Sequence, residues 1–207
     1  MGCNASTLAK IHNVDELILE TGFSSSHICH LYNRFHSLDK DDKGLLNRGD
    51  FQNISELAVN PLGDRIINNF FPDGVDLIDF NSFARTLARF RPVEESLKKE
   101  PDSPEPINSR ANKLKFAFQL YDQDKDGKIS NNELLQVLRL MLGVQVTEEQ
   151  LDNITDRTIQ EADLDGDNAI SFEEFKKVRA KLSGHFLASS CLTSDWDLGW
   201  GYGVASL

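Results

Sequence analysis

The chain has 207 residues, of which 33 are acidic and 22 are basic, and its formal net charge is −11 at pH 7. This length suffices for two small lobes, each with its own core. The acidic balance argues against nucleic acid as a partner, because phosphate binding needs a basic surface. The sequence has no run of about 18 apolar residues that would predict a membrane-spanning helix.

The amino terminus carries a lipidation pattern. Met-Gly-Cys-Asn-Ala-Ser fits the N-myristoylation motif, with Gly2 exposed once Met1 is removed. One myristoyl chain gives only marginal membrane binding, on the order of 10⁴ M⁻¹. Cys3 either accepts a palmitoyl group that makes attachment durable or stays a free thiol. We therefore predict a myristoylated segment over residues 1–22.

The cysteines indicate a reducing compartment, and the histidines give no sign of a further metal site. Cys3, Cys29 and Cys191 show no paired spacing, and no secretory signal is present. His27 and His30 flank Cys29, but on a helix the three do not share one face, so we expect no metal there. No catalytic triad, phosphate loop or zinc pattern is recognisable, and we expect a protein that is not an enzyme.

The first half of the chain contains a weakened metal-binding loop. Calcium takes six to eight oxygens, and a 12-residue EF-hand loop supplies them from positions 1, 3, 5, 7, 9 and 12, with glycine at position 6. The segment Asp39–Asp50 keeps Gly44 and the apolar Leu46 at position 8. Lys43 at position 5 repels a cation, however, and Asp50 is one methylene shorter than the usual glutamate.

A second weakened loop follows at Phe71–Ser82. It keeps Ile78 at position 8 and the following Phe83, but its first and last positions have lost their carboxylates. We interpret both segments as structural loops that complete a pair without holding calcium. Residues 91–110 then carry four of the six prolines without apolar periodicity, which predicts a linker.

The run Asp122–Glu133 fills every liganding position. Gly127 takes the sharp turn, and Ser130 stands where a water is usually held. Only the backbone carbonyl of Lys128 is used, so its side chain is irrelevant in this interpretation. The expected ligands are Asp122, Asp124, Asp126, Lys128 and Glu133.

The same layout recurs in Asp163–Glu174. Asn168 replaces the usual glycine, and asparagine tolerates the left-handed region better than other side-bearing residues. Ile129 and Ile170 share position 8, which predicts a short strand pairing between the loops. We expect two Ca²⁺ ions in this half, the second bound by Asp163, Asp165, Asp167, Ala169 and Glu174.

Apolar residues recur every three or four positions on both sides of all four loops, which predicts helices there. Ser24 and the pair Thr147 and Gln150 have the pattern of helix N-caps. The predicted fold is all-α, with four EF-hand helix-loop-helix units in two lobes and short β pairing between loops. The N-lobe spans 23–90, the C-lobe spans 111–182, and an atypical tail spans 183–207.

The helix that follows the third loop has surplus apolar surface. Leu134, Val137, Leu138 and Met141 satisfy one core face, whereas further leucines fall largely off it. A helix that is apolar on two faces is either buried on both or offers one to a partner. We predict a groove that docks an amphipathic helix; the competing interpretation is packing between the lobes. The proposed lining residues are Leu135, Leu138 and Leu142.

On these residues the chain resembles the calcineurin B homologous proteins. The resemblance runs from the Met1-Gly2 start to about Leu182. Its most telling stretches are Leu57–Ile67, Arg89–Pro92, Asn108–Arg110 and Glu133–Leu142. Members of that family are myristoylated, and only their last two loops bind calcium. The related phosphatase regulator calcineurin B also binds calcium in its first two loops, so the weakened loops here favour the homologous proteins.

The resemblance implies particular partners. Family members bind a juxtamembrane cytoplasmic helix of plasma-membrane sodium/proton exchangers, support exchange and surface delivery, and can inhibit calcineurin. Some take part in microtubule-linked trafficking, and Val137–Leu142 looks like one of the family's nuclear export signals. The implied localisation is cytoplasmic, peripheral at plasma membrane and endomembranes, with nuclear shuttling. The alternatives are a cytosolic calcium buffer and a calcineurin B-like phosphatase regulatory subunit.

Overall fold

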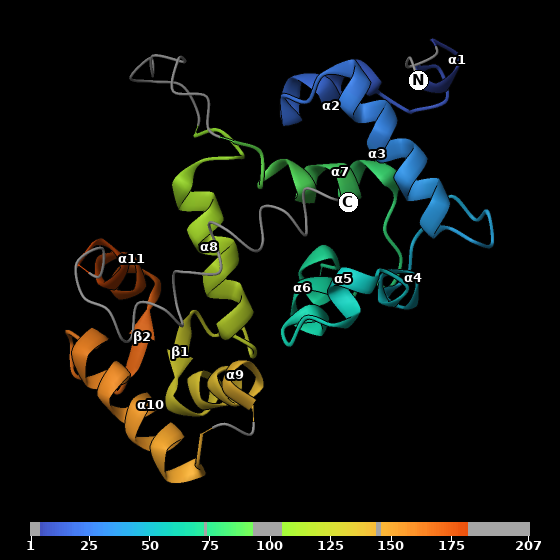
Figure 1. Cartoon of the computed structure of the whole chain (residues 1–207). Coiled ribbons are helices and arrows are strands. Elements are labelled where there is room, and N and C mark those ends of the chain that lie inside the picture. The colour runs from blue at the N-terminus through green and yellow to red at the C-terminus, as the bar shows by residue number, and fades with distance from the viewer. Residues whose placement is uncertain (1–4, 73, 93–104, 144–145, 182–207) are drawn as a thin grey trace. The chain divides into compact units, whose positions relative to one another are not determined.

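The computed structural model describes residues 5–72, 74–92, 105–143 and 146–181 (Figure 1). The predicted tail and most of the predicted linker lie outside these residues. The helices and strands are α1 (Ala5–Leu8), α2 (Val14–Thr21), α3 (Ser25–Leu38), α4 (Arg48–Gln52), α5 (Ser55–Ala58), α6 (Gly63–Phe70), α7 (Phe80–Ala88), α8 (Arg110–Tyr121), β1 (Lys128–Ser130), α9 (Asn131–Leu142), α10 (Glu148–Ala162), β2 (Ala169–Ser171) and α11 (Phe172–Lys181).

The predicted fold class is confirmed. The described residues form four helix-loop-helix units, made by the pairs α3 and α4, α6 and α7, α8 and α9, and α10 and α11. The helices begin where the sequence predicts. Ser24 Oγ accepts a hydrogen bond from the His27 amide at 3.3 Å. Thr147 Oγ1 accepts from the Gln150 amide at 3.3 Å, and Gln150 Oε1 accepts from the Thr147 amide at 3.0 Å, which completes a capping box.

The chain divides into two compact units. Among the described residues, the first unit contains those up to 59 and those between 67 and 113, and the second contains 60–66 and those from 114 onward. Residues 60–66 fall within the predicted N-lobe, so the division is not simply sequential. Within the described residues, no helix is long and apolar enough to cross a bilayer.

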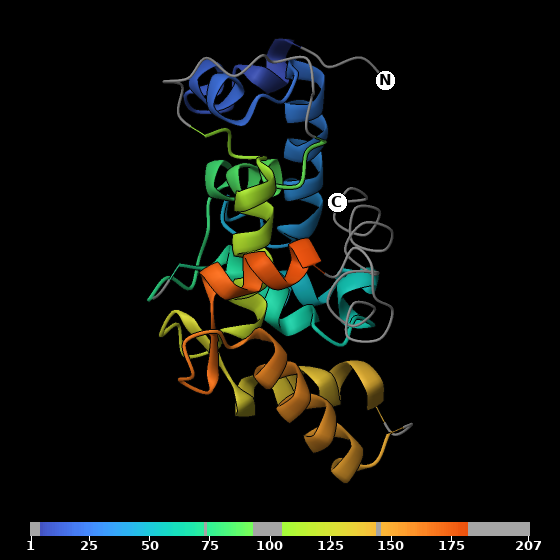
Figure 2. The ribbon, with the colours of Figure 1, turned by 90° about the vertical axis from the view of Figure 1, so that its left-hand side faces the viewer.

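An aromatic core holds the first unit together. Phe83 on α7 is fully buried, and its ring centroid lies 5.6 Å from that of Phe35, 6.1 Å from Phe51 and 6.0 Å from Phe70. These rings join α3, α4, α6 and α7. Helix α7 contacts both α2 and α3, and the two views show α3 and α7 side by side (Figures 1 and 2). Burial of these rings stabilises the unit without any bound ion.

Cys29 departs from the sequence expectation. The cysteine spacing predicts unpaired thiols, whereas Cys29 is buried on α3 and disulfide-bonded. Cys3 and Cys191 lie outside the described residues. His27 and His30, which flank Cys29 on α3, are both exposed.

The two strands of the second unit form the predicted pairing. β1 and β2 are antiparallel, with Ile129 opposite Ile170 and Lys128 opposite Ser171. Both isoleucines are buried. In the same unit, the ring of Phe118 on α8 lies 5.6 Å from that of Phe175 on α11. The strand pairing fixes the two acidic loops to one another through backbone bonds.

Candidate calcium sites

The third loop places its carboxylates around a common centre. Asp122, Asp124 and Asp126 offer ligand oxygens that all lie within 4.8 Å of one another. Asp122 Oδ2 accepts from the Gly127 amide at 3.1 Å, which fixes the carboxylate against the turn. Gly127 has φ 88°, as position 6 requires. Backbone amides also donate to Asp124 Oδ1 and Asp126 Oδ1, so the loop holds all three carboxylates close together despite their mutual repulsion.

One oxygen of the third loop lacks a partner. Asp122 is 7% exposed, and its Oδ1 is buried without a hydrogen bond. A buried unpaired carboxylate oxygen is costly unless a cation satisfies it. Oxygen-only ligands of this number suit a hard cation of the calcium type. The residues present therefore fit Ca²⁺.

Glu133 closes the third loop from the start of α9. Its Oε1 accepts from the Gln123 amide at 2.7 Å, and its Oε2 accepts from the Ser130 amide at 2.9 Å and the Ser130 hydroxyl at 2.7 Å. One carboxylate thus caps α9 and reaches back to the loop's beginning. Both oxygens are held on the loop side, where position 12 contributes its bidentate ligand.

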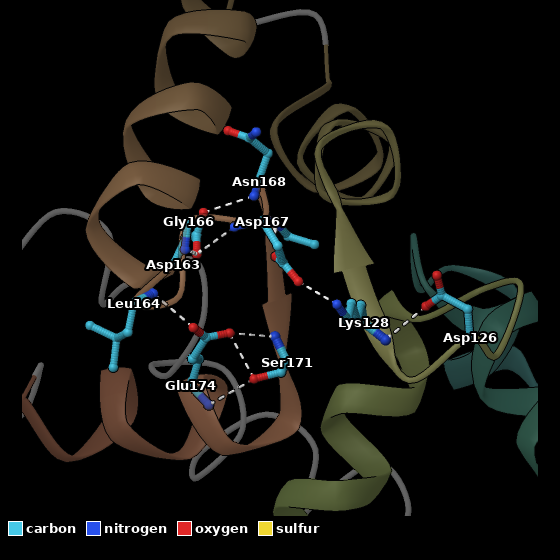
Figure 3. A network of polar contacts seen from close by, with 10 residues as sticks. Asp126, Lys128, Asp163, Leu164, Gly166, Asp167, Asn168, Ser171 and Glu174 are labelled. Carbon is cyan, nitrogen blue, oxygen red and sulfur yellow. Dashed lines mark hydrogen bonds and ion pairs between the residues drawn. The ribbon is translucent and has the colours of Figure 1, made fainter.

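The fourth loop repeats this arrangement (Figure 3). Asp163, Asp165 and Glu174 offer ligand oxygens within 4.8 Å of one another. Glu174 Oε1 accepts from the Leu164 amide at 2.7 Å, as Glu133 does at the corresponding position of the third loop. Asn168 has φ 62°, so the prediction that it adopts the left-handed turn is confirmed.

The electrostatics of the two loops differ at position 1. Burial raises the pKa of Asp122, and the charges of Glu133, Asp126 and Asp124 add to this effect against one bond from Gly127. Burial also acts on Asp163, but the amides of Asn168, Gly166 and Asp167 outweigh it and lower its pKa. The charged form of Asp122 is therefore less well compensated by its surroundings than the charged form of Asp163.

Glu174 gives the calcium-free protein a pH dependence. Burial acts to raise its pKa, but bonds from the Leu164 amide and from the hydroxyl and amide of Ser171 lead the opposing effects, and the pKa falls from 4.5 to about 2. Because the folded pKa lies below the unfolded one, these bonds stabilise the fold fully above about pH 4.5. Their contribution is lost as the pH falls towards 2.

We expect Glu174→Gln to flatten the acid limb of stability measured in a calcium chelator. The measurement is the melting temperature from pH 6 down to pH 2. Glu173→Gln removes an exposed neighbouring carboxylate and serves as the matched control. Parallel curves for Glu174→Gln and wild type would contradict the assignment.

The first loop keeps the start of the cage but not its end. Asp39 Oδ2 accepts from the Gly44 amide at 2.6 Å, and Asp39 Oδ1 is buried without a partner. Lys43 pairs with Asp41 at 2.7 Å, which places an ammonium where the third loop has an acid. Asp50 Oδ2 accepts from the Asn47 amide at 2.8 Å, as in a capping box.

Asp50 does not repeat the second bond that Glu133 makes. The amide of Lys40, at position 2, donates instead to the Leu38 carbonyl at 3.0 Å. The shorter side chain thus caps its helix without closing the loop. Among the described residues, neither the first nor the second loop forms a group of three carboxylates able to hold a metal ion.

The second loop is built on packing. Phe71 at its first position is 3% exposed, and the Ser82 amide at its last position donates to Asp79 Oδ1 at 2.9 Å. Leu46 and Ile78 form an antiparallel bridge, with amide–carbonyl distances of 2.9 Å in both directions. The first two loops are therefore paired through position 8.

The structure corrects the prediction for the side chain of Lys128. The loop pattern gives that side chain no part, but its Nζ pairs with Asp167 Oδ2 of the other loop (Figure 3). The bond to Asp167 and the charges of Asp167, Asp165 and Asp126 raise the Lys128 pKa. Position 7 of a single loop gives no sign of this contact, because it depends on the pairing of two loops.

Arg65 is a further residue beside the site that the sequence patterns do not indicate. It lies within residues 60–66 of the second unit, and its Nη1 donates to the Leu120 carbonyl at 2.8 Å. Its Nη2 donates to Gln136 Oε1 at 3.3 Å. A guanidinium at the carboxyl end of α8 interacts favourably with the dipole of that helix. These two hydrogen bonds also connect α8 to α9 next to the third loop.

The predicted groove residues lie on α9. Leu135 and Leu142 are half-buried, Leu138 is 3% exposed, and Leu140 is 46% exposed. Leu138 thus contributes to the core, while its neighbours keep part of their surface. The predicted lipidation residues Gly2 and Cys3 lie outside the described residues. The groove and the lipid stay predictions.

Paired helix-loop-helix units around acidic loops define the class of EF-hand calcium-binding proteins. Residues 111–178 match the EF-hand domain pair family. The calcineurin B protein of Naegleria gruberi is 42% identical over 177 residues, which cover 86% of this chain and 92% of that protein. The calcineurin B protein of Kluyveromyces lactis is 44% identical over 164 residues, covering 79% and 86% respectively. The Candida glabrata protein of the same name is 41% identical over 163 residues, covering 79% and 85%.

The chain belongs to the calcineurin B-like family of EF-hand proteins. It is a calcium-binding protein of the regulatory type, and its proposed ligands lie within segments that fold as EF-hand loops. The narrower assignment to the calcineurin B homologous proteins goes beyond these relatives.

Proposed function

We propose that this protein is a calcium-loaded adaptor that binds an amphipathic helix of a membrane transporter. Two Ca²⁺ ions, one in each loop of the C-lobe, hold the EF-hand pair in its helix-binding form. The observation that carries the proposal is the contrast between loops. Among the described residues, two groups of carboxylates could hold a metal ion, one in the third loop and one in the fourth.

The surface of α9 supports a helical partner. Leu140 is 46% exposed, and Leu135 and Leu142 keep part of their surface beside the buried Leu138. Calcium-loaded EF-hand pairs present apolar grooves to the apolar face of a target helix. Docking such a helix would cover the surplus leucines.

A juxtamembrane helix of a plasma-membrane sodium/proton exchanger is the first candidate. Lys43 and Asp50 weaken the first loop as a calcium site. Phe71 and Ser82 stand where the second loop would need carboxylates. This contrast with the last two loops supports the two-ion pattern of the calcineurin B homologous proteins. Myristoylation at Gly2, with or without palmitoylation at Cys3, would place the adaptor at the membrane. Cytoplasmic location with nuclear shuttling belongs to the same proposal.

A phosphatase partner is the second candidate. The relatives that share 41–44% identity carry the name calcineurin B. In this alternative, a helix of the phosphatase catalytic chain would occupy the same groove on α9. The two candidates therefore differ in the helix that is bound, not in the site.

Calorimetry with two peptides tests the proposal. One peptide carries the exchanger helix and the other carries the calcineurin helix, and each is titrated into the full chain with calcium and with chelator. The exchanger helix is expected to bind at least about tenfold tighter with calcium, and calcium to bind tighter with the helix by the same factor, as linkage requires. Equal calcium affinity with and without either helix would indicate a buffer.

Matched variants locate the groove. Leu135→Gln with Leu142→Gln is expected to weaken helix binding about tenfold or more, because polar side chains would replace apolar contacts. Leu19→Gln changes a leucine that is 85% exposed in the first unit and is expected to leave binding unchanged. If the calcineurin helix alone binds, the second candidate replaces the first.

A further inference from the structure

Lys128 connects the two acidic loops. It stands at position 7 of the third loop and at the start of β1. Its Nζ pairs with Asp167 Oδ2, which is position 5 of the fourth loop. Its backbone amide donates to Asp126 Oδ1 of its own loop at 2.7 Å. Figure 3 shows the residue between the two aspartates, with the backbone turned to one and the ammonium to the other.

The strand register places the lysine there. Lys128 lies opposite Ser171, and the next pair is Ile129 opposite Ile170. Both isoleucines are buried, so the register cannot slip without exposing them. The side chain of Lys128 is therefore delivered to the fourth loop by a fixed piece of backbone. The Lys128 and Asp167 side chains are 47% and 31% exposed, which leaves the ammonium able to move away when a competitor arrives.

We propose that the Lys128 ammonium competes with Ca²⁺ for the carboxylates of the fourth loop. A residue of the third loop thereby lowers the calcium affinity of the fourth loop. This inference rests on the proposed calcium sites. Without calcium, the ammonium satisfies one carboxylate of the fourth loop. Entry of Ca²⁺ at that loop must displace the ammonium from Asp167 and overcome its repulsion.

The same residue has an opposite role in the third loop. There its backbone carbonyl occupies the liganding position 7, and the amide bond to Asp126 supports the loop. The backbone of Lys128 thus supports the third site, whereas its ammonium opposes the fourth most strongly, because Asp167 is the carboxylate that it pairs with. The third loop is expected to bind Ca²⁺ first. The fourth loop is expected to have a lower calcium affinity, because the ammonium of Lys128 pairs with its Asp167.

Lys128→Gln tests this role. Glutamine keeps the backbone amide bond and most of the side-chain stem, and it removes only the ammonium. Calcium affinity of the fourth loop is expected to rise about tenfold at low salt, a change of about 1.4 kcal/mol. The gain is expected to shrink in high salt, because the lysine is exposed and screened. Affinity of the third loop is expected to change less than about twofold.

Lys115→Gln is the matched control. Lys115 is an exposed lysine of α8, so its replacement makes the same change in net charge and leaves the Lys128–Asp167 pair in place. Amide NMR of the full chain reads the loops separately, through the Gly127 amide that donates to Asp122 and the Asn168 amide that donates to Asp163. No loop has to be disabled for this measurement.

The outcomes separate the inference from the proposed function. If wild type shows no calcium-dependent shift at either amide, the proposed sites fail. If both amides titrate, but Lys128→Gln and Lys115→Gln move the Asn168 midpoint equally, the sites stand and the competitor role is wrong. A tightening at Gly127 instead of Asn168 would also overturn it.

Discussion

Glu133→Gln and Glu174→Gln are each expected to remove one calcium ion from the protein. In calorimetry of the full chain, each single variant should bind one ion with near-normal affinity. The disabled loop should be weakened on the order of 100-fold, because the bidentate position is neutralised and Ca²⁺ loses both a ligand and a charge. The double variant should show no binding at micromolar calcium.

The structure explains why this position dominates. Each glutamate spans its loop, accepting from the second residue at one oxygen and from the ninth at the other. Gln replaces one acceptor oxygen with a donor group, which faces the Gln123 or Leu164 amide or the ion. The loop then closes poorly even where the other carboxylates remain.

Asp50→Asn provides the control for these variants. Asp50 holds the same position in the first loop, but its carboxylate caps a helix at 2.8 Å from the Asn47 amide. The change is expected to leave calcium stoichiometry untouched and to cost about 1 kcal/mol of stability through the cap. A lost calcium ion in Asp50→Asn would mean that the first loop is a working site.

Phe83→Ala is expected to destabilise the first unit by about 3–5 kcal/mol, the range for removing a buried aromatic ring. Phe83 is 0% exposed and touches Phe35, Phe51 and Phe70, so the cavity opens at the junction of four helices. Such a loss is a large share of the stability of a small lobe. The measurement is urea unfolding followed by a signal from the first unit.

Calcium should not rescue this variant. Because the proposed ions bind in the second unit, saturating calcium is expected to add about 2.7 kcal/mol per site there at about 100 times Kd, and little to the first unit. Leu19→Ala removes a side chain that is 85% exposed and is expected to change stability by less than about 0.5 kcal/mol. Equal losses for Phe83→Ala and Leu19→Ala would show that the aromatic cluster is not the core.

Much of the fold was readable from the sequence because EF-hand loops impose local rules. Gly127 and Asn168 stand where the turn needs positive φ, and both adopt it. Leu46 and Ile78 pair although both of their loops have weakened ligand sets, because an apolar residue at position 8 is a packing requirement independent of the ion. Thr147 and Gln150 marked a helix start through side-chain chemistry alone.

Contacts between distant segments were not readable in the same way. The Lys128–Asp167 pair depends on the register of two strands and on the reach of a flexible side chain. Arg65 joins the second unit although much of the chain on either side of residues 60–66 belongs to the first. The disulfide of Cys29 left no trace in cysteine spacing. Each of these requires the tertiary arrangement, which local periodicity does not encode.

Native mass spectrometry of the full chain with a slight excess of calcium tests the central claim most directly. The account expects a dominant species carrying two Ca²⁺ ions, reduced to one by Glu133→Gln or by Glu174→Gln. A wild-type protein that carries no calcium, or one that keeps two ions in both variants, would contradict it.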